Sequence, residues 1–477
     1  MYDVIIIGAG IVGSATAYYL SQYDLKLAVL EASNDVANGT TKANSAVIHA
    51  GYDPKPGSLM AKYNVEGSRL TKDLCAKLDV PYINDGSLVL AFSEEDLETL
   101  KELYQRGLAN GVEDLHLLNY EQTKEIEPAI GENVYGSLLA GTSAVVSPWE
   151  LCLALAETAV RNGCDLKLCN EVTAIRKDEE GHFVVTTTAG EYHSKYIINA
   201  AGIYADKVHE MIGEKEFTIK PTRGQYFLLD KSQNHLARHT LFQCPNEKGK
   251  GVAVTPTVHG NLMVGPDAEV LDHEDLSTTA KVLSFVREKA GLSIPSIDYR
   301  ENIRNFAGLR ARSDRGDFII EESKSVKNFY NLAGMASPAL SSAAAIGIVA
   351  KDWVLGKENF AKKEHYVDSR RRIKFKQLSA EEKNELIKKN PAYGRVICRC
   401  ETVTEGEILE TFNTPIPPRS IDGVKRRTNA GMGRCQGGFC GEKVAMILKE
   451  KLHLDYNEIL QDKPGSQILE KQAKEDY

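Results

Sequence analysis

The sequence predicts an α/β fold followed by a small, separate C-terminal domain, and three observations support this prediction. Residues 2–31 have the pattern of a strand, a glycine turn, a helix and a second strand. Residues 195–202 form another apolar run that ends in a glycine turn. Four of the nine cysteines lie between residues 398 and 440, beyond the alternating segments. Alternating strands and helices indicate a parallel sheet covered by helices, and the cysteine cluster indicates an additional domain.

The first segment predicts a dinucleotide site. The run from Val4 to Ile7 has no polar break, as expected for a strand buried on both faces. Gly8, Gly10 and Gly13 then follow in the GxGxxG spacing, which allows a sharp turn, backbone approach to a pyrophosphate and close packing of helix on strand. The helix over 11–23 would direct its positive N-terminal end at the phosphates. After the second strand, Glu31 can accept hydrogen bonds from a ribose. The motif suits FAD or NAD, and its position at the start of the chain favours FAD.

Composition restricts the class of protein. The chain has 477 residues, 42% hydrophobic and 26% charged, as in soluble globular proteins of two or three domains. The net charge of -8 gives no bulk argument for nucleic-acid binding. The start MYDV leads directly into a strand, so we expect no signal peptide and a cytoplasmic protein. The weakly polar run 332–354 contains Ser337, Pro338 and Lys351, which favours a buried helix over a membrane span.

Between these ends, hydrophobic periodicity predicts alternating elements. A polar loop from residue 38 leads to His49, which by pattern alone is typical of a core histidine. The helix after Pro338 is rich in Ala and Ser, so another surface can approach it closely. The expected helices cover 58–78, 94–110, 117–128, 148–162, 203–212 and 272–290, and the expected strands cover 82–92, 136–146, 164–168, 172–177, 183–188, 195–202, 218–229, 251–264, 306–310, 318–320 and 329–334.

The segment 362–389 is charged and basic and includes Arg370, Arg371 and Arg372. The pattern predicts a solvated linker with one helix. The alternative is a docking surface for an acidic partner or for an anionic membrane face.

The cysteine cluster predicts a metal site. Cys398, Cys400, Cys435 and Cys440 supply four thiolates. Zinc sites usually use CxxC pairs, whereas the CxC pair here and the nearby glycines suit a [2Fe-2S] cluster, which needs two thiolates on each iron. A structural zinc site is the alternative.

Over most of its length the chain resembles the D-amino-acid-oxidase-type FAD oxidoreductases, and within them the bacterial glycerol-3-phosphate oxidase and dehydrogenase group. The resemblance is carried by segments that occur in the family's order, among them GAGIVGSATAYYL, NSAVIHAG, PTRGQYFLL, FAGLRA and LAGMASPALSSAAA. The motif TNAGMGRCQGGFC resembles the [2Fe-2S] module of bacterioferritin-associated ferredoxins.

The resemblance implies a domain plan. It consists of a discontinuous Rossmann-like FAD-binding domain (1–80, 141–215 and 300–357), an inserted antiparallel-sheet substrate domain (81–140 and 216–299), a basic linker (358–390), a small helical [2Fe-2S] domain (391–450) and a tail (451–477).

The resemblance also implies residue roles. His49 matches the active-site base, with Arg310 beside the reaction centre. Lys250, Arg310 and Ser337 match positions that hold the substrate. FAD contacts are implied for Gly8, Gly10, Ile11, Val12, Gly13, Glu31, Thr41, Asn44, Ser45, Val172, Ala201, Gly202, Gly334, Met335, Ser337 and Leu340.

The implied activity is oxidation of sn-glycerol 3-phosphate, a phosphorylated polyol, to dihydroxyacetone phosphate. A hydride would pass to flavin N5, and the electrons would continue through the [2Fe-2S] cluster to an acceptor protein or partner subunit, with attachment at the inner membrane face through that partner as one alternative. The oxidase members lack the cysteine module, so its presence favours a dehydrogenase. The rivals are an L-2-hydroxyglutarate dehydrogenase or oxidase, an amine or amino-acid dehydrogenase, and a non-catalytic electron-transfer subunit.

Overall fold

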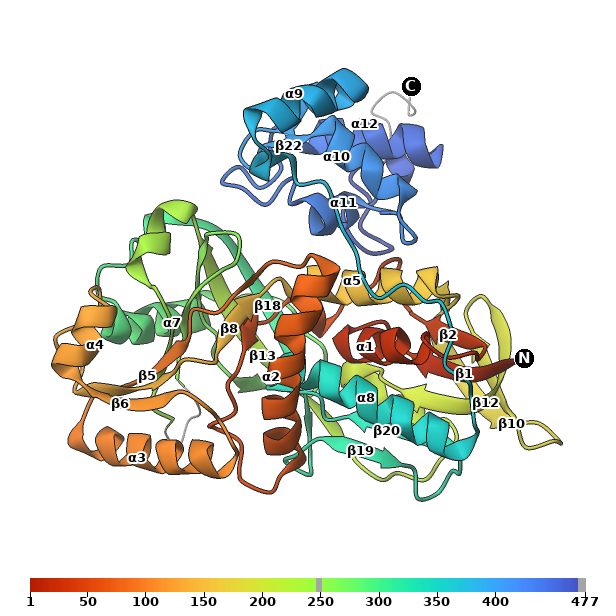
Figure 1. Ribbon diagram of the computed structural model, residues 1–477, viewed down its shortest axis with the longest axis horizontal. Coiled ribbons are helices and arrows are strands. Elements are labelled where there is room, and N and C mark those ends of the chain that lie inside the picture. Colours follow the sequence, from red (N-terminus) through yellow and green to blue (C-terminus); the bar gives the residue numbers. More distant parts are fainter. Residues whose placement is uncertain (246–250, 471–477) are drawn as a thin grey trace.

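The computed structural model describes residues 1–245 and 251–470. Figure 1 shows a wide lower body made of two halves, with the C-terminal domain lying over the side that carries α5 (Pro148–Arg161). The half that contains the N-terminus holds one sheet and the other half holds a second sheet, while α2 (Leu59–Leu78) lies between them. The fold is the predicted α/β architecture.

The first sheet has eight strands in the order β10-β11-β12-β1-β2-β9, with β20 on β12 and β19 on β20. Pairing is parallel between β1 and its neighbours β2 and β12, and between β12 and β20. The strand ends Ile7 and Asn199 are therefore neighbours. The bounds are β1 Tyr2–Ile7, β2 Leu27–Leu30, β9 Asp165–Lys167, β10 Val172–Lys177, β11 Phe183–Thr187, β12 Gly190–Asn199, β19 Ile319–Glu322 and β20 Phe329–Ala333.

Three helices pack closely beside this sheet. They are α1 (Ile11–Leu20), α2 and α8 (Ala339–Lys357). A Cβ on Gly67 of α2 would lie 2.3 Å from the Ser341 carbonyl oxygen of α8, and one on Gly347 of α8 would lie 2.9 Å from the Ala15 carbonyl carbon of α1. The predicted close approach to the Ala- and Ser-rich helix is confirmed. By length and composition α8 could cross a membrane, but it contributes to the buried core.

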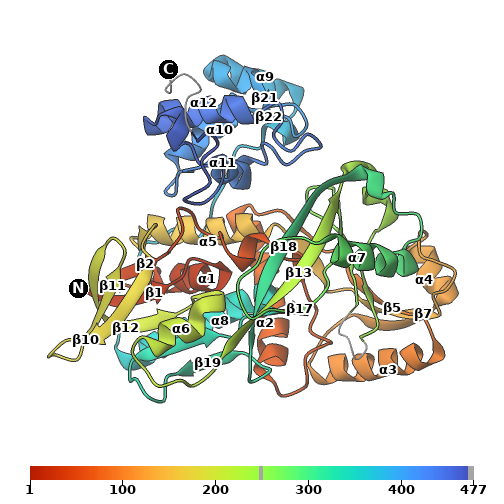
Figure 2. The same ribbon diagram turned by 180° about the vertical axis from the view of Figure 1, so that it is seen from behind.

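The second sheet has nine strands in the order β17-β13-β16-β15-β14-β5-β7-β6, with β18 on β13. Strand β18 pairs antiparallel with β13 from Ile219↔Ser313 to Leu229↔Asn302 (Figure 2). Residues 302–313, which the sequence assigned to the FAD-binding domain, thus belong to this sheet, because pairing with β13 outweighs their position in the chain. The bounds are β5 Ser87–Ala91, β6 Leu115–Asn119, β7 Gly136–Ala140, β13 Ile219–Leu229, β14 Thr240–Gln243, β15 Val254–Pro256, β16 Leu262–Val264, β17 Glu269–Val270 and β18 Asn302–Ser313.

Helices α3 (Glu94–Ala109), α4 (Tyr120–Ile126) and α7 (Ala280–Ser293) lie beside this sheet, and β3 (Val47–Ile48), β4 (Tyr82–Ile83) and β8 (Ala144–Val146) form a small third sheet. Three expected helices begin late. The side chain of Asn119 caps α4, so residues 115–119 are free to pair as β6. Thr279 caps α7, and α6 (Ala205–Glu210) follows a 3₁₀ turn at Gly202–Tyr204.

The C-terminal domain is small and mostly helical, as expected. Its helices are α9 (Ala380–Lys389), α10 (Glu405–Glu410), α11 (Ile421–Thr428) and α12 (Gly441–Leu452), and a hairpin joins β21 (Val396–Cys398) to β22 (Val403–Thr404). Its own apolar core includes Ile408, Val424 and Leu448 together with Cys398 and Cys440.

The basic segment before this domain is anchored to the body of the protein at a few side chains. Arg370 is 3% exposed, and its Nε lies 2.7 Å from Oε2 of Glu157, which is fully buried on α5. Arg372 pairs with Glu150, also on α5, and Lys374 Nζ lies 2.7 Å from Asp79 Oδ1. Glu150 and Glu157 are two helical turns apart and therefore share one face of α5. The prediction of a solvated segment with one helix holds for most of 362–389, which is exposed or half-buried and contains α9. It is wrong at Arg370, because a buried carboxylate of α5 binds this arginine.

Candidate functional site

The glycine turn after β1 has the geometry of a phosphate-binding turn. Gly8 has φ +101°, and a Cβ there would lie 2.6 Å from the Ala200 carbonyl oxygen. A Cβ on Gly13 would lie 2.0 Å from the Gly8 carbonyl oxygen, so only glycine lets α1 pack on β1. Gly10 caps α1 without a side-chain hydrogen bond, and the nearest atom to a Cβ there is Thr41 Oγ1 at 3.5 Å. The first turn of α1 therefore leaves room and backbone N–H groups for a pyrophosphate.

Glu31 lies at the mouth of this turn, directly after β2. Its carboxylate accepts hydrogen bonds from the N–H groups of Ala9 (2.7 Å) and Ser33 (2.8 Å). Burial raises the pKa of Glu31, although these N–H groups act in the opposite direction. The carboxylate is thus held beside the turn where an adenosine ribose would lie in a dinucleotide site.

The other predicted cofactor positions lie around the carboxyl ends of the same strands. Ala201 and Gly202 follow β12 and Gly334 follows β20, whereas Val172 begins β10, two residues after Asn170, whose N–H donates to the Glu31 carbonyl oxygen (2.8 Å). Thr41 Oγ1 accepts a hydrogen bond from Ile11 N at 3.0 Å, which connects the loop after β2 to α1. The amide of Asn44 bonds the Thr41 carbonyl (2.8 Å) and Ala46 N (2.8 Å), and Ser45 Oγ lies 3.3 Å from the Tyr226 hydroxyl. Dinucleotides bind at this edge of parallel sheets, so these residues fit FAD.

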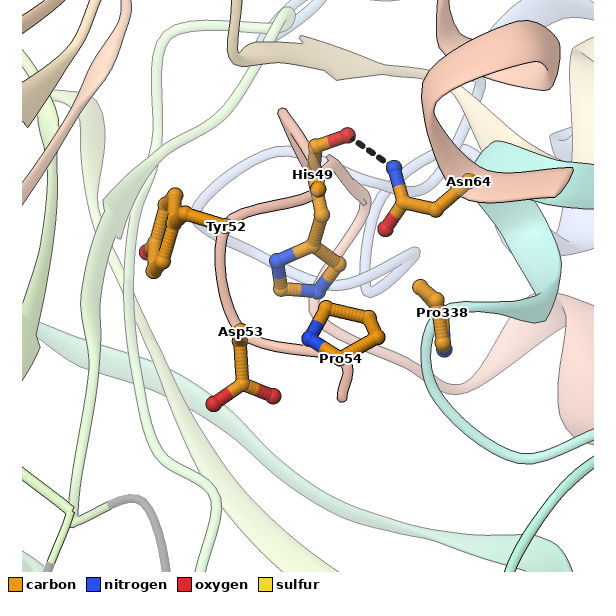
Figure 3. A pocket seen from close by; sticks show the side chains of 7 residues that line it. His49, Tyr52, Asp53, Pro54, Asn64 and Pro338 are labelled. Atoms are coloured by element: carbon orange, nitrogen blue, oxygen red, sulfur yellow. Dashed lines mark hydrogen bonds between the residues drawn. The ribbon is translucent and has the colours of Figure 1, made fainter. Parts of the chain in front are cut away.

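His49 follows β3 and lines a small pocket together with Pro54 and Pro338 (Figure 3). Its backbone is fixed on both sides, since its N–H donates to Ser341 Oγ (2.8 Å) and its carbonyl accepts from Asn64 Nδ2 (2.5 Å). The ring stacks on Phe242 with centroids 5.6 Å apart, and Nε2 lies 3.3 Å from Ser337 Oγ. A half-buried imidazole held at a pocket differs from the core histidine that the pattern alone suggested.

Three predicted substrate contacts have different outcomes. Ser337 is exposed and reaches His49. Arg310 of β18 donates from Nη2 to the Asp267 carbonyl oxygen (3.0 Å) and lies on the strand face that also carries Gly308. A Cβ on Gly308 would lie 1.9 Å from the Ala43 carbonyl oxygen, so this face adjoins the loop of Asn44 and Ser45. Lys250 lies outside the described residues.

Sequence reasoning missed the residues that orient these groups. Phe242, Asn64 and Ser341 all contact His49, yet they belong to β14, α2 and α8. Tyr226 stacks on Phe306 (centroids 4.6 Å) beside Ser45. None of these residues has a motif of its own, and the only signal was the placement of aromatic residues in strands.

The four predicted metal ligands gather in the C-terminal domain as two pairs. The Sγ atoms of Cys400 and Cys435 are 3.6 Å apart, and the thiol of Cys440 is hydrogen-bonded to Cys398. That hydrogen bond, together with the Gly431 and Glu401 N–H groups, lowers the pKa of Cys398 to about 6 against the effect of burial. In the described part of the chain, no three Cys, His, Asp or Glu side chains converge on one ion position.

Two thiolates about 2.3 Å from one tetrahedral metal ion lie roughly 3.8 Å apart, which is close to the separation of Cys400 and Cys435. The donor set of two thiol pairs therefore fits a [2Fe-2S] cluster, with one pair for each iron. Cys398 and Cys440 are buried while Cys400 is exposed, so one side of the site is open to solvent.

Comparison with known proteins agrees with both sites. Residues 3–353 match the FAD dependent oxidoreductase family, and residues 396–450 match the BFD-like [2Fe-2S] binding domain. A glycerol 3-phosphate dehydrogenase of Caloramator mitchellensis is 48% identical over 472 residues, covering 98% of each chain. A glycerol 3-phosphate oxidase of Mycoplasma genitalium is 36% identical over 354 residues, covering 72% of this chain and 92% of the oxidase.

Among solved structures, the dithionite-reduced L-alpha-glycerophosphate oxidase from Mycoplasma pneumoniae with FAD bound is similar, with a TM-score of 0.73 and 34% identity. The similarity covers 77% of this chain and 98% of that one. The cofactors of this protein are FAD and a [2Fe-2S] cluster. The chain belongs to the FAD dependent oxidoreductase family, and its C-terminal part is a BFD-like [2Fe-2S] binding domain.

Proposed function

We propose that the protein is a dehydrogenase that oxidises sn-glycerol 3-phosphate to dihydroxyacetone phosphate. One observation carries this proposal: the likeness to the Caloramator mitchellensis glycerol 3-phosphate dehydrogenase extends over 98% of both chains, so it includes the cysteine domain. When bound, FAD supplies the hydride acceptor, and the cluster supplies one-electron relay chemistry toward an acceptor protein outside the chain.

His49 is the proposed general base for the secondary alcohol. Oxidation of an alcohol carbon requires removal of the hydroxyl proton, and a positioned imidazole contributes typically about 10²- to 10⁴-fold to such a step. The contacts to Phe242, Ser341 and Asn64 hold His49 in one orientation. The Ser337 hydroxyl at 3.3 Å can hydrogen-bond the imidazole or the substrate.

Arg310 is the proposed anchor for the phosphate dianion. Its guanidinium can bind two phosphate oxygens at once, whereas the ammonium of Lys250, the second proposed anchor, would act as a point charge. Among the described residues, Arg310 is hydrogen-bonded through Nη2, to the Asp267 carbonyl, and its other donors can bind a substrate.

The experiment that tests the substrate is anaerobic bleaching of the bound flavin. We expect glycerol 3-phosphate to bleach it, and L-2-hydroxyglutarate, proline and glycine to leave it oxidised. Bleaching by hydroxyglutarate or by an amine alone would replace the proposed substrate, and bleaching by none would support a non-catalytic electron-transfer subunit. Iron and acid-labile sulfide should be present at two per chain, and zinc in their place would remove the relay.

The residue roles have a matched test. His49→Gln should bind FAD normally but bleach about 10²- to 10⁴-fold more slowly, and near-normal bleaching would contradict the base. Arg310→Ala should raise KM for glycerol 3-phosphate far more than for unphosphorylated glycerol, with Arg310→Lys between Arg310→Ala and the native protein. An equal rise for both substrates would exclude the phosphate role.

A further inference from the structure

The loop after β2 connects the two cofactor-binding parts of the chain. Residues 34–42 lie between Glu31 and the loop of Asn44 and Ser45, and their inner side is hydrogen-bonded to the glycine turn. Ala37 N donates to the Ala9 carbonyl oxygen (3.1 Å), and Thr41 Oγ1 accepts from Ile11 N (3.0 Å). The position of this loop therefore sets the position of backbone groups on which FAD depends.

The outer side of the same loop is covered by the C-terminal domain. Asp35 is 2% exposed, and both of its carboxylate oxygens bind Arg427, at 2.8 and 2.9 Å. Arg426 Nη2 also reaches Asp35 Oδ2 at 2.9 Å, and its Nη1 reaches Asp462 at 2.7 Å. Both arginines belong to α11 and are almost fully buried.

A second set of contacts joins the two ends of the loop to the chain after α12. The Asn34 amide donates to the Asp462 carbonyl oxygen (2.8 Å), and Lys42 pairs with the Asp462 carboxylate. The loop is thus bound at Asn34, Asp35 and Lys42 by one domain and at Ala37 and Thr41 by the glycine turn. Burial would raise the pKa of Asp35, but Arg427 and Arg426 outweigh it and lower the pKa to about 2.

We propose that Arg426, Arg427 and Asp462 are positioning residues for FAD: they hold residues 34–42 against the glycine turn, so that FAD binding and docking of the [2Fe-2S] domain stabilise each other. A carboxylate buried without its cation is strongly unfavourable. If α11 leaves, the outer side of residues 34–42 loses its ion pairs and hydrogen bonds, and the contacts of Ala37 and Thr41 are left to hold the loop against the turn.

The FAD-bound Mycoplasma pneumoniae oxidase sharpens this inference. The similarity covers 98% of the oxidase but 77% of this chain. The oxidase therefore holds FAD without a counterpart of the remaining quarter of this chain. The fold alone can therefore bind FAD. In this chain, the proposed dependence of FAD binding on the C-terminal domain arises from the buried Asp35. It concerns retention of FAD and is independent of which substrate is oxidised.

The first test measures FAD dissociation from the full-length holoprotein by the recovery of flavin fluorescence after dilution. Asp35→Asn and Arg427→Gln should raise the FAD dissociation constant about tenfold, a coupling of ordinary size between two sites. Arg427→Lys keeps the charge but loses the two-point contact, so it should lie between Arg427→Gln and the native protein. Iron is measured in every variant so that FAD loss is compared at equal cluster content.

The matched control is Lys231→Gln. Lys231 Nζ lies 2.7 Å from Glu401 Oε2, so it joins the same domain to the second sheet without touching residues 34–42. This variant should keep FAD affinity within about twofold of the native value. Native affinity in both Asp35→Asn and Arg427→Gln would overturn the proposal, as would an equal loss in a Lys231→Gln protein whose α11 keeps native hydrogen exchange.

The second test needs no variant and covers the case in which they fail to fold. Coupling between two binding events is reciprocal. Removal of FAD from the native protein must therefore increase amide hydrogen exchange in α11, and FAD must restore the protection. Exchange in residues 421–428 that is the same with and without FAD would overturn the proposal.

Discussion

The two cofactor-binding ends of this chain are held by different forces. At the FAD turn, position is set by backbone contact, because a Cβ on Gly13 would lie 2.0 Å from the Gly8 carbonyl. At the boundary of the [2Fe-2S] domain, position is set by buried charge pairs such as Arg370–Glu157 and Arg427–Asp35. Steric fit is local in sequence, whereas the arginine–carboxylate pairs join residues hundreds of positions apart. The two regions should therefore respond differently to mutation and to pH.

The largest expected effect is at the FAD turn. Gly13→Ala places a methyl group against backbone that cannot move aside, so we expect loss of more than about 3 kcal/mol of unfolding free energy together with loss of FAD. Gly10→Ala is the control, since its Cβ meets only Thr41 Oγ1 at an ordinary 3.5 Å. The fold should survive Gly10→Ala while FAD is weakened. Thermal unfolding of the FAD-free proteins separates the two effects, and equal loss of stability in both variants would contradict the steric account.

The next effect is at the charged boundary. Arg370→Met leaves Glu157 buried without its cation, which should cost about 3–5 kcal/mol. The double variant Arg370→Met with Glu157→Leu replaces the pair by apolar groups and should recover most of that loss. Denaturant unfolding of the two proteins measures the difference. A double variant as unstable as the single one would show that the pair's geometry, and not charge neutralisation, holds the segment.

The sequence predicted the FAD turn better than it predicted the boundary of the [2Fe-2S] domain. The strand, glycines and acid of residues 2–31 encode their fold within one segment, so the site they form could be predicted. His49 and the four cysteines were recognised through motifs, but the groups that orient His49 come from β14, α2 and α8. The burial of Arg370 could not be predicted, because a charged run is usually solvated and its partner Glu157 on α5 looks like a surface residue of an amphipathic helix. The Arg426–Asp35 contact spans 391 residues, and no local pattern carries it.

A third prediction concerns acid. Burial would raise the pKa of both Asp35 and Glu150, but Arg427 and Arg426 lower that of Asp35 to about 2, and His259 and Arg372 lower that of Glu150 to about 2. Carboxyl groups in unfolded chains titrate near 4, so Asp35 contributes about 2 and Glu150 about 3 kcal/mol that is complete above pH ~4–5 and is lost as the pH falls toward 2. We expect the [2Fe-2S] domain to undock across this window, measured by hydrogen exchange of α11. In Asp35→Asn the loss should be smaller, because one of the two titrating groups is gone.

The smallest expected effect concerns Asp85, a buried acid that has no arginine or lysine paired with it among the described residues. Asp85 Oδ1 is buried, and no residue within 1–245 or 251–470 is hydrogen-bonded to it. Burial raises the pKa of Asp85 to about 7, and Glu127 adds to the rise while the Asp85 N–H and His239 oppose it. The folded protein therefore holds this proton more tightly than the unfolded chain does, so stability falls as pH rises from about 4 to about 7 and stays lower above that.

Asp85→Asn removes this titration and keeps the shape of the side chain. It should raise the unfolding free energy by about 1 kcal/mol at pH 8 and leave it nearly unchanged at pH 4. Paired denaturant melts at the two pH values measure the change. Asp35→Asn is the opposite case, since it should destabilise at pH 8 because it breaks a pair with Arg427. If both variants changed stability in the same direction at pH 8, burial alone, and not the presence of a cation, would determine the energetics of the acids in this protein.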